Sequence, residues 1–222
     1  SIEIPLAIDL SGCGLDYIVQ DESGQIRLGA MCSLRTLETS PILQDYAGGI
    51  ISRSAGEIIG VQFRNLATVG ASVASRYGFS DVITPLLACG ARVRLHEQGE
   101  LSLEAFLRAP RRRDVLTEII LPKAGGAGAF CNFRASTGDF SILNVAALRR
   151  ENTWRLAVGA RPHCAALAYK AMEQLDGGAE ADLAARTAAE ELSFAGNMRA
   201  SAEYRQALCQ TLCARVLREV KK

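Results

Sequence analysis

The sequence lacks the motifs by which several common classes of protein are recognised. It contains neither a GxGxxG fingerprint nor a P-loop with its lysine, so neither common phosphate-binding pattern is present. It has no run of 18 apolar residues, which argues against a membrane-spanning helix. The net charge is only +1, which excludes the long-range field that drives nonspecific binding to nucleic acids.

Histidine is scarce and the cysteines are scattered. The two histidines have no neighbours in the sequence that would complete a metal-ligand set, so we expect no bound metal. The seven cysteines form no CxxC pair, and their number is odd, so we expect no disulfide framework and a reducing cytoplasm. Cys209 and Cys213 lie four residues apart on a predicted helix, where two small core residues are favoured over half a metal site.

The pattern that is present indicates an α+β protein. The 222 residues are enough for one large domain or two small ones. Residues 1–122 mix short strands with short helices, and residues 129–222 read as three strands followed by helices. Between them the run KAGGAGA, residues 123–129, is the most flexible segment and predicts a boundary between two domains. Residues 6–12, LAIDLSG, read as a first strand.

One stretch, QFRNLATVGASVASRYGFSD, is crowded with small residues. Backbone amides that point into a concavity can bind an anion, and glycine lets a ligand approach closely. The candidates for such a site are Thr68, Val69, Gly70, Ala71 and Ser72. We expect them to form a turn at the edge of an open cleft, with several amides lacking protein partners. The alternative is a tight turn packed against a neighbouring strand.

Two charged features near this stretch each allow two interpretations. Asp81 could accept hydrogen bonds from ribose hydroxyls, or it could cap a helix that starts at Val82. The run PRRRD, residues 110–114, could bind an acidic partner or a phosphate, although a solvated turn before a strand is favoured.

The stretch QFRNLATVGASVASRYGFSDVITPLLACGARVRL closely resembles the FAD-binding medium subunits of the molybdenum hydroxylases. This family includes the xanthine dehydrogenases and the carbon monoxide dehydrogenases. The resemblance continues in GQIRLGAMCSLRTLE and DVLTEIILP, and then in FRASTGDFSILNVAALRR and SAEYRQALCQTLCARVL. It therefore covers essentially the whole chain.

The resemblance implies a fold and a set of cofactor contacts. Residues 1–122 would be the second subdomain of a vanillyl-alcohol-oxidase-like FAD-binding domain, and residues 129–222 the family's C-terminal domain with a three-stranded antiparallel sheet. Residues 68–72 would face the flavin diphosphate, and Ser75 and Asp81 would lie near the cofactor. Ile58 would lie against the adenine, and Leu116 would approach the isoalloxazine ring.

The sequence departs from the family pattern in two places. The second glycine of the turn is Ala71 here, which crowds a backbone that must approach phosphate. The family's other diphosphate loop belongs to a first subdomain that would precede Ser1, and we expect that subdomain to be absent, with half of the anion cradle.

The resemblance also implies a function. The chain would be an oxidoreductase subunit of a heteromeric complex, with FAD as its cofactor. Electrons would pass from iron–sulfur clusters to FAD and on to NAD or another acceptor. Molybdopterin and the 2Fe–2S clusters would lie on a large and a small partner subunit, and neither nucleic acid nor membrane would be a partner. The alternative is a non-catalytic scaffold that keeps the fold without holding FAD.

Overall fold

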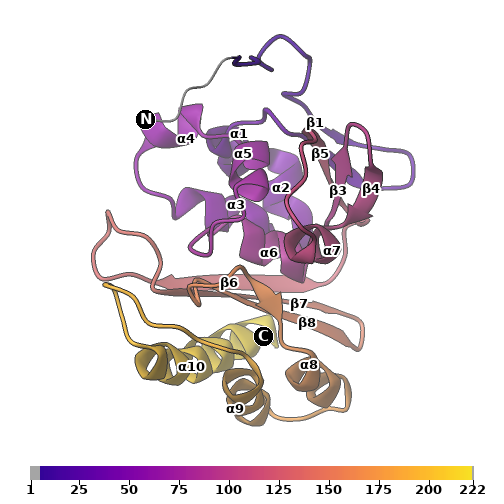
Figure 1. Cartoon of the computed structure of the whole chain (residues 1–222). Coiled ribbons are helices and arrows are strands. Elements are labelled where there is room, and N and C mark those ends of the chain that lie inside the picture. The colour runs from indigo at the N-terminus through magenta and orange to yellow at the C-terminus, as the bar shows by residue number, and fades with distance from the viewer. Residues whose placement is uncertain (1–5, 222) are drawn as a thin grey trace.

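The computed structural model describes residues 6–221 and confirms the expected α+β class (Figure 1). Two antiparallel sheets are present, with strand orders β1-β2-β5-β3-β4 and β6-β7-β8-β9. The strands are β1 (Ile18–Gln20), β2 (Ile26–Gly29), β3 (Arg92–Leu95), β4 (Gly99–Ser102), β5 (Leu116–Leu121), β6 (Ala127–Phe133), β7 (Leu143–Arg150), β8 (Thr153–Gly159) and β9 (Ala166–Leu167). The two-residue β9 adds a fourth strand to the three expected in the second sheet.

Short helices dominate the first half of the chain and long ones the second. The helices are α1 (Leu34–Thr39), α2 (Pro41–Asp45), the 3-10 helix η1 (Tyr46–Gly49), α3 (Ile50–Gly56), α4 (Val61–Leu66), α5 (Val69–Ala74), α6 (Ile83–Ala88), α7 (Leu103–Arg108), α8 (Tyr169–Asp176), α9 (Ala181–Glu191) and α10 (Ala202–Val220). No helix in residues 6–221 is long and apolar enough to cross a membrane.

The five-stranded sheet buries one face against the short helices. Leu28, Val93 and Ile119 come from three neighbouring strands, and all three are fully buried in one core. Residues at the helix starts determine where the helices that cover this core begin. Ser33 caps α1 by accepting a hydrogen bond from the Thr36 amide, and Pro41 stands at the start of α2, where its missing N–H costs nothing.

The four-stranded sheet is buried on both faces. Figure 1 shows it between α3 and α6 on one side and α8, α9 and α10 on the other. Successive residues of β7 therefore enter different cores: Ala146 belongs to the core shared with the first half of the chain, and Val145 to the core beneath α10. Cys209 and Cys213 are buried in that second core, with their Sγ atoms 3.7 Å apart, as their interpretation as core residues predicts.

The segment between the two sheets contains no strand from residue 122 to residue 126. Helix α6 nevertheless packs against β7 and β8, so the two halves share a core. A hinge between domains at residues 123–129 stays a prediction. The strand expected at residues 6–12 is wrong: this segment is coil, and Leu6 and Ile8 are about three-quarters exposed because no sheet covers them (74% and 75%).

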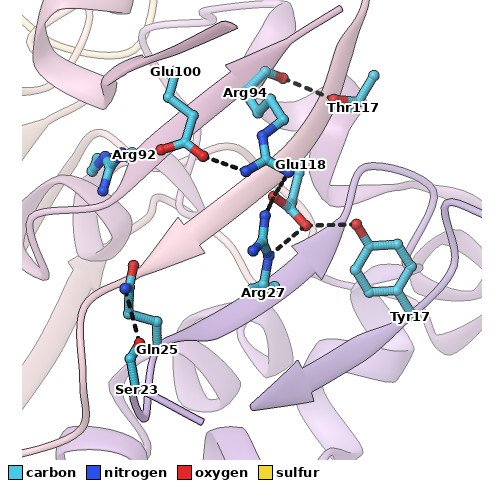
Figure 2. Close-up of polar contacts among 9 residues, drawn as sticks. All are labelled: Tyr17, Ser23, Gln25, Arg27, Arg92, Arg94, Glu100, Thr117 and Glu118. Atoms are coloured by element: carbon cyan, nitrogen blue, oxygen red, sulfur yellow. Dashed lines mark hydrogen bonds and ion pairs between the residues drawn. The ribbon is translucent and has the colours of Figure 1, made fainter. Parts of the chain in front are cut away.

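A charged network lies on the opposite face of the five-stranded sheet, and Figure 2 shows its members. The Glu118 carboxylate accepts two hydrogen bonds from the Arg27 guanidinium, at 2.9 and 2.7 Å, and one from the Tyr17 hydroxyl at 2.6 Å. Arg94 adds an ion pair at 3.0 Å and also pairs with Glu100. The network joins β2, β3, β4 and β5 to the segment before β1.

Glu118 is only 3% exposed, so its charge depends on these partners. Burial raises the pKa of Glu118, but the hydrogen bonds from Arg27 and Tyr17 and the two arginine charges outweigh it, so the pKa lies below its ordinary 4.5. Burial and the neighbouring carboxylate raise the pKa of Tyr17 to about 12. The hydroxyl therefore remains a donor at neutral pH.

We predict that Glu118→Gln lowers the free energy of unfolding by about 1–3 kcal/mol at pH 7, because it removes the charge of a buried carboxylate that accepts hydrogen bonds from Arg27 and pairs with Arg94. The contribution is present above the unfolded-state pKa and is lost as the pH falls below about 4.5. Denaturant unfolding of wild type and variant from pH 7 to pH 3 measures it. Glu100→Gln is the matched control and should cost under about 1 kcal/mol, since that pair is more exposed. Equal losses for both variants, or a difference that does not shrink in acid, would contradict this account.

Candidate functional site

A cavity of about 660 Å³ opens between α4, α5 and the loops that follow α5 and β6. Its walls are mainly apolar, and four aromatic residues stand on them, Phe63, Tyr77, Phe79 and Phe140; we call it the aromatic cavity. The Tyr77 and Phe79 rings are stacked at 5.1 Å with an interplanar angle of 10°. The Phe79 and Phe140 rings lie 4.1 Å apart. Such a wall suits a flat ring system, which aromatic faces bind by stacking.

The structure brings most of the predicted site residues together at this cavity. Those that line it are Ile58, Thr68, Ala71, Ser72, Ser75 and Asp81. Val69 and Gly70 are buried beneath it. Leu116 does not join them, because it lines a separate, smaller cavity on the other side of α5.

Residues 68–72 form the start of helix α5 rather than an open turn. Thr68 is the N-cap, and its hydroxyl accepts from the Ala71 amide at 3.2 Å. The amides of Val69 and Gly70 donate to the carbonyls of Cys32 and Ala30, and the Ser72 amide donates to the Thr68 carbonyl. The expectation that several of these amides lack partners is therefore wrong. The loop after β2 and the helix itself satisfy them.

Gly70 is small because a strand end lies against it. A Cβ atom at this position would stand 2.6 Å from both the Cβ and the carbonyl oxygen of Ala30. This contact alone explains why the position requires glycine, so the glycine is not evidence that a phosphate approaches it. Ala71 is exposed on the cavity wall in ordinary helical conformation, so its methyl group costs no backbone strain.

Asp81 is neither a helix cap nor an open acceptor. Helix α6 begins at Ile83, whose amide donates to the Ser80 hydroxyl, so the expectation that Asp81 caps a helix starting at Val82 is wrong. The Asp81 carboxylate is 5% exposed and binds three groups from the second half of the chain. These are the Arg134 guanidinium at 2.5 Å and, each at 2.6 Å, the Ser141 hydroxyl and the Asn144 amide.

Burial raises the pKa of Asp81, whereas the charge of Arg134 and the hydrogen bonds from Ser141 and Asn144 act in the opposite direction. Asn144 completes the cluster by accepting from the Thr84 hydroxyl at 2.6 Å. The cluster fixes the loop after β6 against α6, and that loop supplies Phe140 to the aromatic cavity.

Arg134 is a site residue that sequence reasoning missed. It lines the aromatic cavity, and its Nε is buried without a hydrogen-bond partner among the described residues. It lies 53 residues from its partner Asp81, so no local pattern connects the two. The only signal was its place in FRAST, one of the segments that carry the family resemblance.

Comparison with family models divides the chain into two matches. Residues 1–124 match the FAD binding domain in molybdopterin dehydrogenase, and residues 128–220 match the CO dehydrogenase flavoprotein C-terminal domain. Among curated proteins, the nicotine 6-hydroxylase medium subunit of Paenarthrobacter nicotinovorans is 24% identical over 218 residues, 90% of this chain and 77% of that protein. The uncharacterized protein YgfM of Escherichia coli K12 is 31% identical over 116 residues, 52% of this chain and 42% of that protein.

Solved structures share the fold. Quinoline 2-oxidoreductase from Pseudomonas putida 86 superposes with a TM-score of 0.82 at 22% identity, over 93% of this chain and 78% of that one. A carbon monoxide dehydrogenase from Hydrogenophaga pseudoflava gives the same TM-score at 24% identity, with the same coverage. Because the first family model alone spans more than half of the sequence, the chain belongs to the FAD-binding medium subunits of the molybdenum hydroxylase family.

Proposed function

We propose that the chain is the electron-transfer subunit of a molybdenum hydroxylase, in which electrons from iron–sulfur clusters reach NAD or another acceptor by way of FAD. The observation that carries the proposal is the aromatic cavity, which gathers six of the predicted cofactor residues on one surface. The finer parts are a xanthine dehydrogenase-like activity, which the sequence resemblance supports, and a cytoplasmic location, which the scattered cysteines support.

The ring systems of FAD fit the cavity. Its volume of about 660 Å³ lies within the roughly 300–1,000 Å³ typical of ligand sites. Phe63, Tyr77 and Phe140 are about half exposed there, so a stacked ring would remove apolar surface from water. Ile58 extends the same apolar wall. The bound flavin would supply the redox chemistry, and these residues would hold it and exclude water.

The diphosphate has fewer donors than the sequence suggested. The Ser72 and Ser75 hydroxyls donate to the carbonyls of Thr68 and Ser72, so both are engaged. The Thr68 hydroxyl accepts from Ala71 and keeps its own proton for an outside acceptor. The Nε–H donor of Arg134 has no hydrogen-bond partner among the described residues. We propose that these two side chains contact the diphosphate, in place of the backbone cradle.

The engaged amides of residues 69–72 also favour the second candidate, a scaffold that keeps the fold without holding FAD. The partners are the same in both cases: a large subunit that binds molybdopterin and a small subunit with iron–sulfur clusters. The nicotine 6-hydroxylase protein is itself a medium subunit, which supports an assembly of this kind. Flavin binding separates the two candidates.

We predict that Ala71→Glu in the full-length protein weakens FAD binding about tenfold or more, because the side chain adds bulk and negative charge at the cavity wall. Stability should be retained, since glutamate three residues after the Thr68 cap favours the start of a helix. Quenching of flavin fluorescence measures the dissociation constant, and thermal denaturation checks the fold.

Ala207→Glu is the matched control, because Ala207 is exposed on α10 and does not line the aromatic cavity. Its FAD affinity should equal that of the wild type. No flavin binding by the folded wild type would establish the scaffold instead. Equal affinity in all three proteins would place FAD outside the aromatic cavity.

A further inference from the structure

The smaller cavity on the other side of α5 is lined by arginines. Its volume is about 150 Å³, the space of about five water molecules. Arg76 follows the end of α5, and Arg111 and Arg112 belong to the segment before β5. Leu116 and Phe106 form part of its apolar wall. We call it the arginine cavity; it shares no lining residue with the aromatic cavity.

Arg76 and Arg111 each form a hydrogen bond to the backbone next to the other. Arg76 donates from Nη1 to the Ala109 carbonyl at 2.6 Å, and Arg111 donates from Nη2 to the Ser75 carbonyl at 2.5 Å. The Arg76 guanidinium also lies over the Phe106 ring, 4.0 Å from its centre. Both guanidiniums are therefore held at the mouth of the cavity, where Arg76 is half-buried and Arg111 is exposed.

These positive charges lack carboxylate partners among the described residues. None of the three arginines forms an ion pair there, and Arg112 has only a 3.4 Å contact with Gln98. Asp114 also lines the cavity, which leaves three positive charges against one negative charge, a net of +2. Its carboxylate accepts from the amides of Glu97, Gln98 and Val115, so it is already engaged.

The unused donors point to an anion. A guanidinium has five N–H donors. The guanidiniums of Arg76, Arg111 and Arg112 each make a single hydrogen bond within residues 6–221. The Arg76 Nε is buried and has no hydrogen-bond partner within residues 6–221. Burial and the charge of Arg111 lower the pKa of Arg76, which means that both destabilise its positive charge. An anion bound between the two guanidiniums would stabilise that charge.

The backbone at Arg76 ends helix α5, because this residue directly follows the C-cap Ser75. Its φ of 50° is left-handed, a conformation that a long side chain seldom adopts and that stores strain. The Arg76 side chain contacts Phe106 and the Ala109 carbonyl and does not line the aromatic cavity.

We propose that the arginine cavity is a binding site for a phosphate group, held by the guanidiniums of Arg76, Arg111 and Arg112. Arginine binds phosphate oxygens through charge-assisted hydrogen bonds, and the cavity has room for one such group. The ligand is free phosphate or the terminal phosphate of a small ester. Because the arginine cavity shares no lining residue with the aromatic cavity, the proposal does not require FAD to bind there and stands whether or not the proposed function holds.

The test is calorimetric titration of the full-length protein with inorganic phosphate and with methyl phosphate, against sodium chloride of equal ionic strength. Arg111→Gln removes one guanidinium from the cavity and should weaken phosphate binding about tenfold or more. Arg113→Gln, two residues away and exposed, is the matched control, because Arg113 does not line the cavity. Its affinity should stay within about twofold of the wild type, as expected for a screened surface charge.

Arg76→Gln is a second variant, checked for folding by thermal denaturation, and should lose binding as Arg111→Gln does. Binding of both anions would show that a phosphate ester can enter, and binding of inorganic phosphate alone would identify the free ion; either supports the site. No binding of either anion beyond that of chloride would overturn the proposal. An equal loss in Arg111→Gln and Arg113→Gln would also overturn it, by showing general charge attraction.

Discussion

The buried carboxylate of Asp81 joins the two halves of the chain beside the aromatic cavity. It comes from the segment before α6, and its three partners, Arg134, Ser141 and Asn144, come from β7 and the loop before it. A buried charge is stable only when its hydrogen-bonding capacity is filled, and removing one member of such a pair costs about 3–5 kcal/mol. Asn144 extends the contact to Thr84 in α6. The loop after β6 is therefore fixed where it closes one side of the aromatic cavity.

Helix α5 and the residues after it contribute to the walls of both cavities. One side presents Ala71, Ser72 and Ser75 to the aromatic cavity, and the end of the helix presents Ala74 and Arg76 to the arginine cavity. Its position is fixed by backbone hydrogen bonds to the loop after β2 and by the close contact of Gly70 with Ala30. The small residues that identify this stretch thus serve packing first. What they leave for a ligand is a smooth, apolar wall.

The sequence predicted those features that local patterns determine. The mixture of short strands and short helices before residue 122 and the strands followed by helices after residue 129 are both observed. Six of the nine candidate site residues line one cavity, but the contacts that hold them in place join residues that are distant in the sequence. The small size of Gly70 is explained by its contact with Ala30, forty residues earlier. The burial of the Asp81 charge is explained by Arg134, which follows β6 in the other sheet. Periodicity and spacing carry no information about such pairs, so the engaged amides and the arginine cavity became visible only in three dimensions.

The most direct test of this account is a crystal structure of the full-length protein with FAD. The account predicts a ring of the cofactor stacked within the aromatic cavity, close to Phe63, Tyr77 or Phe140. It also predicts that the Asp81 carboxylate keeps its contacts with Ser141 and Asn144, since the cavity depends on them. A cofactor bound elsewhere, or an Asp81 side chain turned away from both partners, would contradict it.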